Sequence, residues 1–284
     1  MRDLFPFLPR RLSPGSFFTG FLLALLSVWI VNHLHLLHSS STSPPPPLLL
    51  FDKEKKEKLA VFFGDSITQH AFNPQLDGWV AAVAHYFARK AVVVNRGLSG
   101  YNSRFARAVF DEAVGPLRPD LLILFFGAND ATVPSHVTSV TVDDFQHNLE
   151  SMLIAARTSN PSLAVVLITP PPVWEAALEA ANAAKHKAIV KDRTNDRTRQ
   201  YADAVLAVGA KHAAPVVDAF AGMEGTSTNR QLYLADGLHL NARGNQRLFE
   251  LFTEVVEGQL KGWATTSLPL RFPSWEAMVA MKKA

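Results

Sequence analysis

The sequence predicts an α/β fold, a three-layer α/β/α sandwich built on a mainly parallel five-stranded sheet. Five short apolar runs recur along the chain, and they are continuous rather than alternating, as is typical of strands covered on both faces. They occupy residues 59–63, 91–94, 121–126 and 163–168 and, more weakly, 215–217. Segments with helical periodicity lie between them, and strands that alternate with helices form a parallel sheet wrapped on both sides.

Three segments after these runs carry apolar residues at the spacing of one helix face. They are 76–87, 145–156 and 248–255. Residues three or four positions apart lie on one side of a helix, so each segment can cover the sheet with its apolar side. The last segment follows Asn241, a residue type that favours helix N-termini. We therefore expect a helix to begin there.

Length and composition indicate one globular domain, expected over residues 59–284, with an appendage before it. The 284 residues include no cysteine, which excludes disulfides, thiolate catalysis and cysteine-ligated metal. The formal charge is +3, and the residues up to Phe51 carry +2 of it. The rest of the chain therefore has no basic footprint for nucleic acid, and we expect no such partner.

The appendage has the features of a membrane anchor. A short basic segment, 1–15, precedes an apolar segment, 16–37, which is long enough to cross a bilayer as a helix. Basic residues before this segment and none directly after it favour a cytosolic N-terminus and a luminal or extracellular main domain. A cleaved signal peptide, which would make the protein secreted, and an organellar presequence are the alternatives. Residues 38–58, rich in Ser and Pro and then in charge, are expected to form an extended linker.

The first apolar run ends in Gly64-Asp65-Ser66-Ile67-Thr68. A glycine turn between a buried strand and a helix can expose a serine hydroxyl as a nucleophile, because nearby backbone amides can stabilise negative charge there. The alternative is ordinary turn chemistry, with Asp65 or Ser66 as a helix cap. The choice depends on whether the rest of the chain supplies a base and oxyanion donors.

Ligands of such folds bind beyond the carboxyl ends of the strands, so the residues after each run should meet at one edge of the sheet. His239 is the candidate base, and Asp236, three residues earlier, could orient its ring. The backbone amides of Ser66 and Gly97 and the side chain of Asn129 are the candidate oxyanion donors. Gly97 and Asn129 each have a structural alternative, as a turn glycine and as a cap or Asx-turn residue.

These residues occur in the order of the four blocks of the SGNH (GDSL-type) hydrolases, which the chain resembles from Leu59 to about Gly262. The blocks are Gly64-Asp65-Ser66, Gly97, Gly127-Ala128-Asn129-Asp130 and Asp236-Gly237-Leu238-His239. The resemblance implies a flavodoxin-like sandwich and a serine hydrolase whose triad is Ser66, Asp236 and His239. Ile67 stands where the family name has Leu, a conservative change. The apolar N-terminal segment is a departure from the usually soluble members.

More narrowly, the chain resembles the isoamyl acetate-hydrolysing esterase branch. The resemblance lies in residues 95–104, 169–172, 193–195 and 268–273. It implies a small-molecule carboxylic ester, acetyl or short-acyl, as the substrate. O-deacetylation of a polysaccharide or metabolite, and lysophospholipase or thioesterase activity, would use the same triad and are alternatives. A non-catalytic binding protein tethered to a membrane is the alternative from another functional class.

The sequence contains no His-Glu-x-x-His, Gly-x-Gly-x-x-Gly or P-loop motif, so we expect neither a metal nor a cofactor. It also lacks the Gly-x-Ser-x-Gly elbow of the α/β-hydrolases, because Thr68 occupies the fifth position. The residues that bind substrate and the oligomeric state are not defined by the sequence. Trp174, Phe105 and the segment 173–199 are weaker candidates for the pocket, since an aromatic residue near a loop more often serves packing.

Overall fold

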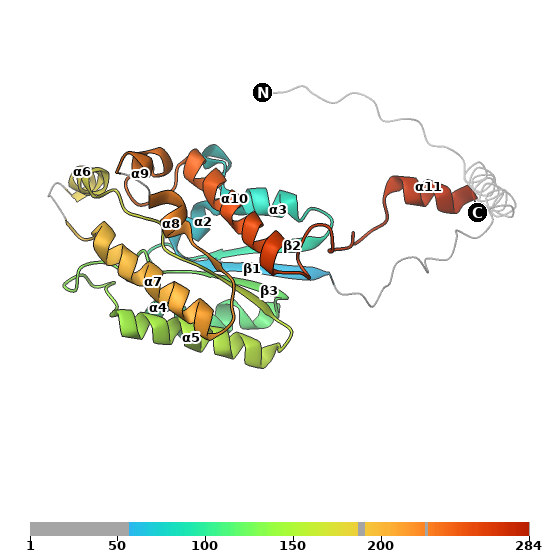
Figure 1. Cartoon of the computed structure of the whole chain (residues 1–284), viewed down its shortest axis with the longest axis horizontal. Helices are drawn as coiled ribbons and strands as arrows, with labels where there is room; N and C mark the ends of the chain where they lie inside the picture. Colours follow the sequence, from blue (N-terminus) through green and yellow to red (C-terminus); the bar gives the residue numbers. More distant parts are fainter. Residues whose placement is uncertain (1–56, 187–190, 225–226, 284) are drawn as a thin grey trace, which may run out of the picture. The chain divides into compact units, whose positions relative to one another are not determined.

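A parallel sheet of five strands forms the centre of the structure (Figure 1). The computed structural model describes residues 57–186, 191–224 and 227–283. The strands are β1 (Lys58–Gly64), β2 (Ala91–Gly97), β3 (Leu121–Phe125), β4 (Ala164–Ile168) and β5 (Val216–Val217). They lie in the order β2-β1-β3-β4-β5, and every neighbouring pair is parallel. The predicted sheet is confirmed, including its weak fifth strand.

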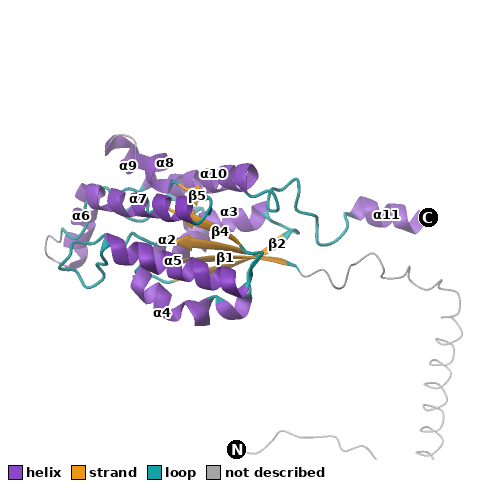
Figure 2. Cartoon of the chain, turned by 60° about the horizontal axis from the view of Figure 1, so that its bottom comes forward, coloured by secondary structure: helices purple, strands orange, loops and turns teal. Residues whose placement is uncertain are grey.

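Helices cover both faces of the sheet and complete the three predicted layers (Figure 2). One face carries α3 (Trp79–Tyr86) and α10 (Ala242–Gln259), and the other carries α4 (Ser103–Ala113), α5 (Val142–Ser159) and α7 (Asn195–Lys211). The predicted helices correspond to α3, α5 and α10. The shorter elements are α2 (Ser66–Gln69), η2 (His70–Phe72), η3 (Pro74–Leu76), η4 (Gly115–Leu117), α6 (Glu175–His186), α8 (Ala219–Glu224), α9 (Ser227–Tyr233) and α11 (Trp275–Lys283).

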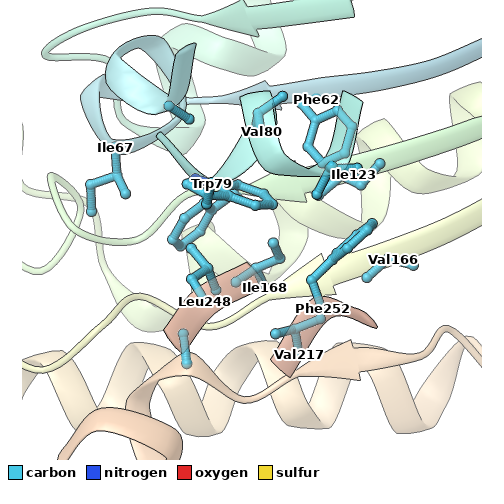
Figure 3. Packing of buried hydrophobic residues seen from close by; sticks show 14 of the residues in the cluster. Phe62, Ile67, Trp79, Val80, Ile123, Val166, Ile168, Val217, Leu248 and Phe252 are labelled. Atoms are coloured by element: carbon cyan, nitrogen blue, oxygen red, sulfur yellow. The ribbon is translucent and has the colours of Figure 1, made fainter. Parts of the chain in front are cut away.

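Successive residues of the central strands face opposite layers and build two hydrophobic cores. On one face, the Phe62 ring of β1 lies edge-on to the Trp79 ring of α3, with centroids 5.3 Å apart (Figure 3). On the other, the neighbouring Phe63 packs against Phe110 of α4 at 5.8 Å. Burying one such side chain stabilises the fold by about 1.5–3 kcal/mol. The strands that end at the site are therefore held from both sides.

Strand β2 departs from the expectation of burial on both faces. Within the described chain it pairs with β1 and lies at the edge of the sheet. Its residue Val92 is 40% exposed. An apolar run thus identified the strand correctly but not its place in the sheet.

The predicted helix over 76–87 is broken near its start. Asp77 has a φ of 48°, in the left-handed region, which ends the turn η3. Helix α3 then begins at Trp79, after Gly78 as its N-cap. The apolar residues keep their helical spacing across the break, so their periodicity in the sequence could not reveal the break.

The predicted N-terminal anchor lies outside the described residues, as do segment 1–15 and nearly all of the linker 38–58. Among the residues that are described, no helix is long and apolar enough to cross a membrane. The described residues up to Met278 belong to one compact unit.

Candidate active site

The turn after β1 places Ser66 at the carboxyl edge of the sheet. Asp65 caps α2, because its Oδ1 accepts a hydrogen bond from the Ile67 N–H at 2.9 Å. Ser66 is the first residue of α2 and borders a cavity. The two interpretations of this turn are therefore compatible, because Asp65 caps the helix while Ser66 faces the cavity.

The loop before α10 brings His239 to Ser66. His239 Nε2 lies 2.9 Å from Ser66 Oγ, and His239 Nδ1 lies 2.8 Å from Asp236 Oδ2. When Nδ1 donates its hydrogen to the carboxylate, Nε2 is free to accept the serine proton. The structure therefore joins the three predicted residues in one hydrogen-bonded chain.

Backbone contacts hold this loop in place. Asp236 Oδ1 accepts hydrogen bonds from the N–H groups of Leu238 at 3.0 Å and His239 at 2.8 Å. The Ala235 N–H donates to the His239 carbonyl at 2.8 Å. Asn241 caps α10, as predicted, by accepting from the Gly244 N–H at 3.0 Å. Hydrogen bonds within the loop thus hold the carboxylate and the imidazole in place.

The pair Asp236 and His239 favours its charged form. Burial raises the pKa of Asp236, but the hydrogen bonds from the His239 ring and the backbone amides outweigh it and leave the pKa below its ordinary value. Burial lowers the pKa of His239, whereas the hydrogen bond and the charge of Asp236 raise it, and the net direction is upward. This electrostatic environment suits a histidine that becomes positively charged when it removes a proton.

Asn129 follows β3 and borders the same cavity as Ser66 and His239. Its Oδ1 accepts a hydrogen bond from Arg193 Nη2 at 3.0 Å, and its Nδ2 donates to the Tyr101 carbonyl at 2.9 Å. An amide nitrogen carries two hydrogens, so Nδ2 has a second N–H that can donate to a ligand. The position of Asn129 is compatible with the predicted oxyanion role.

Gly97 is not among the described residues that border the cavity, and nothing in its surroundings supports the predicted role of its amide as an oxyanion donor. Its N–H already donates to Asn95 Oδ1 at 2.8 Å. The missing side chain serves packing instead, because a Cβ here would lie 2.0 Å from the backbone nitrogen of Gln69. Gly97 lets β2 approach α2 closely.

Gly100 takes the position that was expected of Gly97. It borders the cavity, and its φ of 80° is one that glycine adopts without strain. Within the described part of the chain its N–H makes no hydrogen bond. The sequence placed segment 95–102 at this edge, but the segment contains two glycines. The signal that could have separated them is that Gly97 ends the strand, whereas Gly100 lies in the loop beyond it.

The cavity has a volume of about 380 Å³, and most of the residues that line it are polar in type. Besides the residues discussed above, its polar lining includes His70, Ser99, His136, Asn182, Lys185 and Asp192, and its apolar lining consists of Leu178, Ala181 and Leu238. Part of the segment 173–199 therefore lines the cavity, whereas Trp174 and Phe105 do not border it. No group of His, Asp and Glu side chains in the described residues is arranged to hold a metal ion.

Comparison with known proteins gives the same family on independent grounds. The sequence profile of the GDSL-like Lipase/Acylhydrolase family matches residues 62–247. The isoamyl acetate-hydrolyzing esterase 1 homolog of Bos taurus is 35% identical over 222 residues, which cover 76% of this chain and 86% of that relative. A GDSL esterase/lipase of Arabidopsis thaliana is 34% identical over 224 residues, which cover 75% and 90%.

Among solved structures, the lipase/acylhydrolase from Enterococcus faecalis is similar to this chain with a TM-score of 0.55 and 28% sequence identity. The similarity covers 71% of this chain and 96% of that one. The region matched by the family profile includes Ser66, Asn129, Asp236 and His239. The chain therefore belongs to the GDSL-like lipase/acylhydrolase family, and it is a carboxylic ester hydrolase of the SGNH type.

Proposed function

We propose that this protein hydrolyses small carboxylic esters, with Ser66 as nucleophile, His239 as base and Asp236 as the residue that orients the base. The observation that carries this proposal is the hydrogen-bonded chain from Ser66 Oγ through His239 to Asp236. A serine hydroxyl is a weak nucleophile until a neighbouring base removes its proton. The same chain argues against a non-catalytic binding protein, which has no need of an oriented base.

The reaction follows from these positions. Ser66 Oγ attacks the acyl carbon while its proton passes to His239 Nε2, and the amides of Ser66 and Gly100 and the second N–H of Asn129 Nδ2 stabilise the oxyanion. His239 then gives the proton to the departing alcohol, and the acyl group stays on Ser66. A water molecule, deprotonated by His239, releases the acid and restores the serine.

The cavity supports a short acyl group and a polar alcohol. Only Leu178, Ala181 and Leu238 supply apolar side chains among the described lining, which is little surface for a long hydrocarbon chain. The polar side chains around them can form hydrogen bonds with hydroxyl groups. This lining favours acetyl or short-acyl esters, with the O-acetyl ester of a hydroxylated compound as the second candidate. It disfavours a lysophospholipase.

A panel of p-nitrophenyl esters tests the proposal. The full-length protein should hydrolyse acetate and butyrate esters with a much higher kcat/KM than the octanoate ester. Ser66→Ala should lower kcat by at least ~10³, as loss of a nucleophile does in other serine hydrolases. A folded Ser66→Ala variant with the wild-type rate would disprove the nucleophile. A preference for octanoate would overturn the substrate class and leave the mechanism standing.

A further inference from the structure

The Arg193 side chain connects the cavity wall to Asn129. Its guanidinium is almost completely buried, with 9% of the side chain exposed. Nη2 donates to Asn129 Oδ1 at 3.0 Å, and Nε donates to the carbonyl of Ala128, the preceding residue, at 2.9 Å. The remaining guanidinium nitrogen, Nη1, donates to Asp192 Oδ2 at 2.7 Å. Arg193 thus forms hydrogen bonds with both the side chain and the backbone of the turn that carries Asn129.

These contacts decide which way the Asn129 amide points. A guanidinium has donors and no acceptor, so only the oxygen of the amide can face Arg193. The Tyr101 carbonyl lies on the opposite side and accepts from Nδ2. With the oxygen held by Arg193 and one N–H held by Tyr101, the remaining N–H has a defined direction. An amide without the arginine would lose one of the two contacts that reject the flipped orientation, and the Tyr101 carbonyl alone would remain.

We infer that Arg193 is a positioning residue for the proposed ester hydrolysis, because it fixes Asn129 Nδ2 as a donor to the oxyanion. This inference rests on the proposed function. A lysine could not replace Arg193 fully, because its ammonium lacks the planar fork that binds Oδ1 and the Ala128 carbonyl together.

Arg193 also acts on His239 through its charge. Burial and the positive charge of Arg193 lower the pKa of His239, against the larger raising effect of Asp236. Removal of the charge should therefore raise the pKa of His239 and move the acid limb of the kcat/KM profile to higher pH. A purely structural role would leave this limb in place.

Arg197 provides a matched control. It lies four residues further along the chain, and its Nε donates to the Thr132 carbonyl at 2.8 Å, so it braces the same loop. Its Nη2 donates to the Tyr201 hydroxyl at 2.9 Å. It is not among the described residues that border the cavity, and it makes no contact with Asn129 in the described structure. Loss of Arg197 should affect the loop without releasing the amide.

The experiment compares Arg193→Gln, Arg193→Lys and Arg197→Gln in the full-length protein with p-nitrophenyl acetate. Arg193→Gln should lower kcat about 10- to 100-fold with little change in KM. An oxyanion donor that points in the wrong direction should reduce kcat somewhat less than the complete loss of that donor. Arg193→Lys should be intermediate and should keep the wild-type acid limb. Arg197→Gln should stay within about threefold of wild type even where the melting temperature falls equally.

A double mutant separates positioning from general damage. If Arg193 works through Asn129, then Arg193→Gln should cost almost nothing further in kcat on an Asn129→Ala background. Fully multiplicative losses would overturn the inference, as would a folded Arg193→Gln variant with the wild-type kcat. If Arg193→Gln does not fold, Arg193→Lys on the same background gives the decisive comparison. These outcomes leave the proposed function intact, because that depends on the Ser66→Ala result.

Discussion

The pKa of Asp236 is shifted downward by its surroundings, whereas the pKa values of Asp65 and Asp130 are shifted upward. The Asp236 side chain is 40% exposed, and its hydrogen bonds from His239 and two backbone amides outweigh the raising effect of burial on its pKa. Asp65 and Asp130 are buried, and burial raises the pKa of Asp65 to about 6 and that of Asp130 to about 7.

The difference lies first in the deeper burial of Asp65 and Asp130 and then in the donors that each carboxylate receives. Asp65 accepts from the Ile67 N–H at 2.9 Å, and Asp130 Oδ1 accepts from the Ser103 N–H at 2.9 Å. Asp130 Oδ2 has no hydrogen-bond partner among the described residues. Among these three aspartates, Asp236 is the one whose carboxylate is hydrogen-bonded to the imidazole ring. Proximity to Ser66 in the sequence, which Asp65 has, does not make an aspartate the partner of the base.

The largest expected effect comes from the base itself. His239→Ala should lower kcat by at least ~10³, because Ser66 then has no group to take its proton. His70→Ala is the matched control, since the His70 ring borders the cavity edge-on to His239, with centroids 6.0 Å apart. In the described structure it makes no hydrogen bond with Ser66, so its loss should alter KM more than kcat. Equal losses in kcat would contradict the assignment of the base.

An intermediate effect should distinguish Asp236 from Asp65. Asp236→Asn should lower kcat by about 10² or more, since the ring loses the acceptor that fixes its tautomer. Asp236 raises the pKa of His239, so the acid limb of kcat/KM should also move to lower pH. Asp65→Asn keeps an acceptor for the Ile67 N–H and should move the limb much less. Equal shifts in the two pH profiles would show that the two aspartates act alike.

The smallest effect concerns stability. The folded pKa of Asp130, about 7, lies above its ordinary value of 3.8. Between these values the folded protein keeps a proton that the unfolded chain has lost, so this group makes the free energy of unfolding fall as pH rises from about 4 to 7. Asp130→Asn keeps the acceptor for Ser103 and should flatten that decline in urea unfolding. Because Asp65 contributes in the same direction, some slope should remain, and an unchanged slope would refute the buried protonation.

The fold and the meeting of Ser66, Asp236 and His239 were predictable because both depend on patterns that survive in a single sequence. Apolar runs marked the strands, and the carboxyl-end rule placed Ser66, Asn129 and His239 at one edge. The same rule could not choose between Gly97 and Gly100, since that depends on which amide is already bonded to Asn95. Nor could it show that β2 is an edge strand, because neighbours in a sheet are set by the whole topology.

Other misses had local signals. Helices α4 and α7 begin after Asn102 and Thr194, whose side chains accept from the amides three residues ahead. Both are residue types that favour helix N-termini, so the caps could have been recognised. Arg193 lies in a segment that carries the family resemblance, but nothing local in the sequence points to its partner. Its role depends on a contact with Asn129 across 64 positions of the chain, which only the folded arrangement of β3 and the loop before α7 creates.

The most direct test of the central claim is covalent labelling of the active protein with a fluorophosphonate, followed by mass mapping of the adduct. If Ser66 is activated by His239 and Asp236, one adduct per chain should form on the peptide that contains Ser66, and His239→Ala should slow its formation sharply. No adduct on a folded, ester-hydrolysing sample, or an adduct on another serine, would contradict the account.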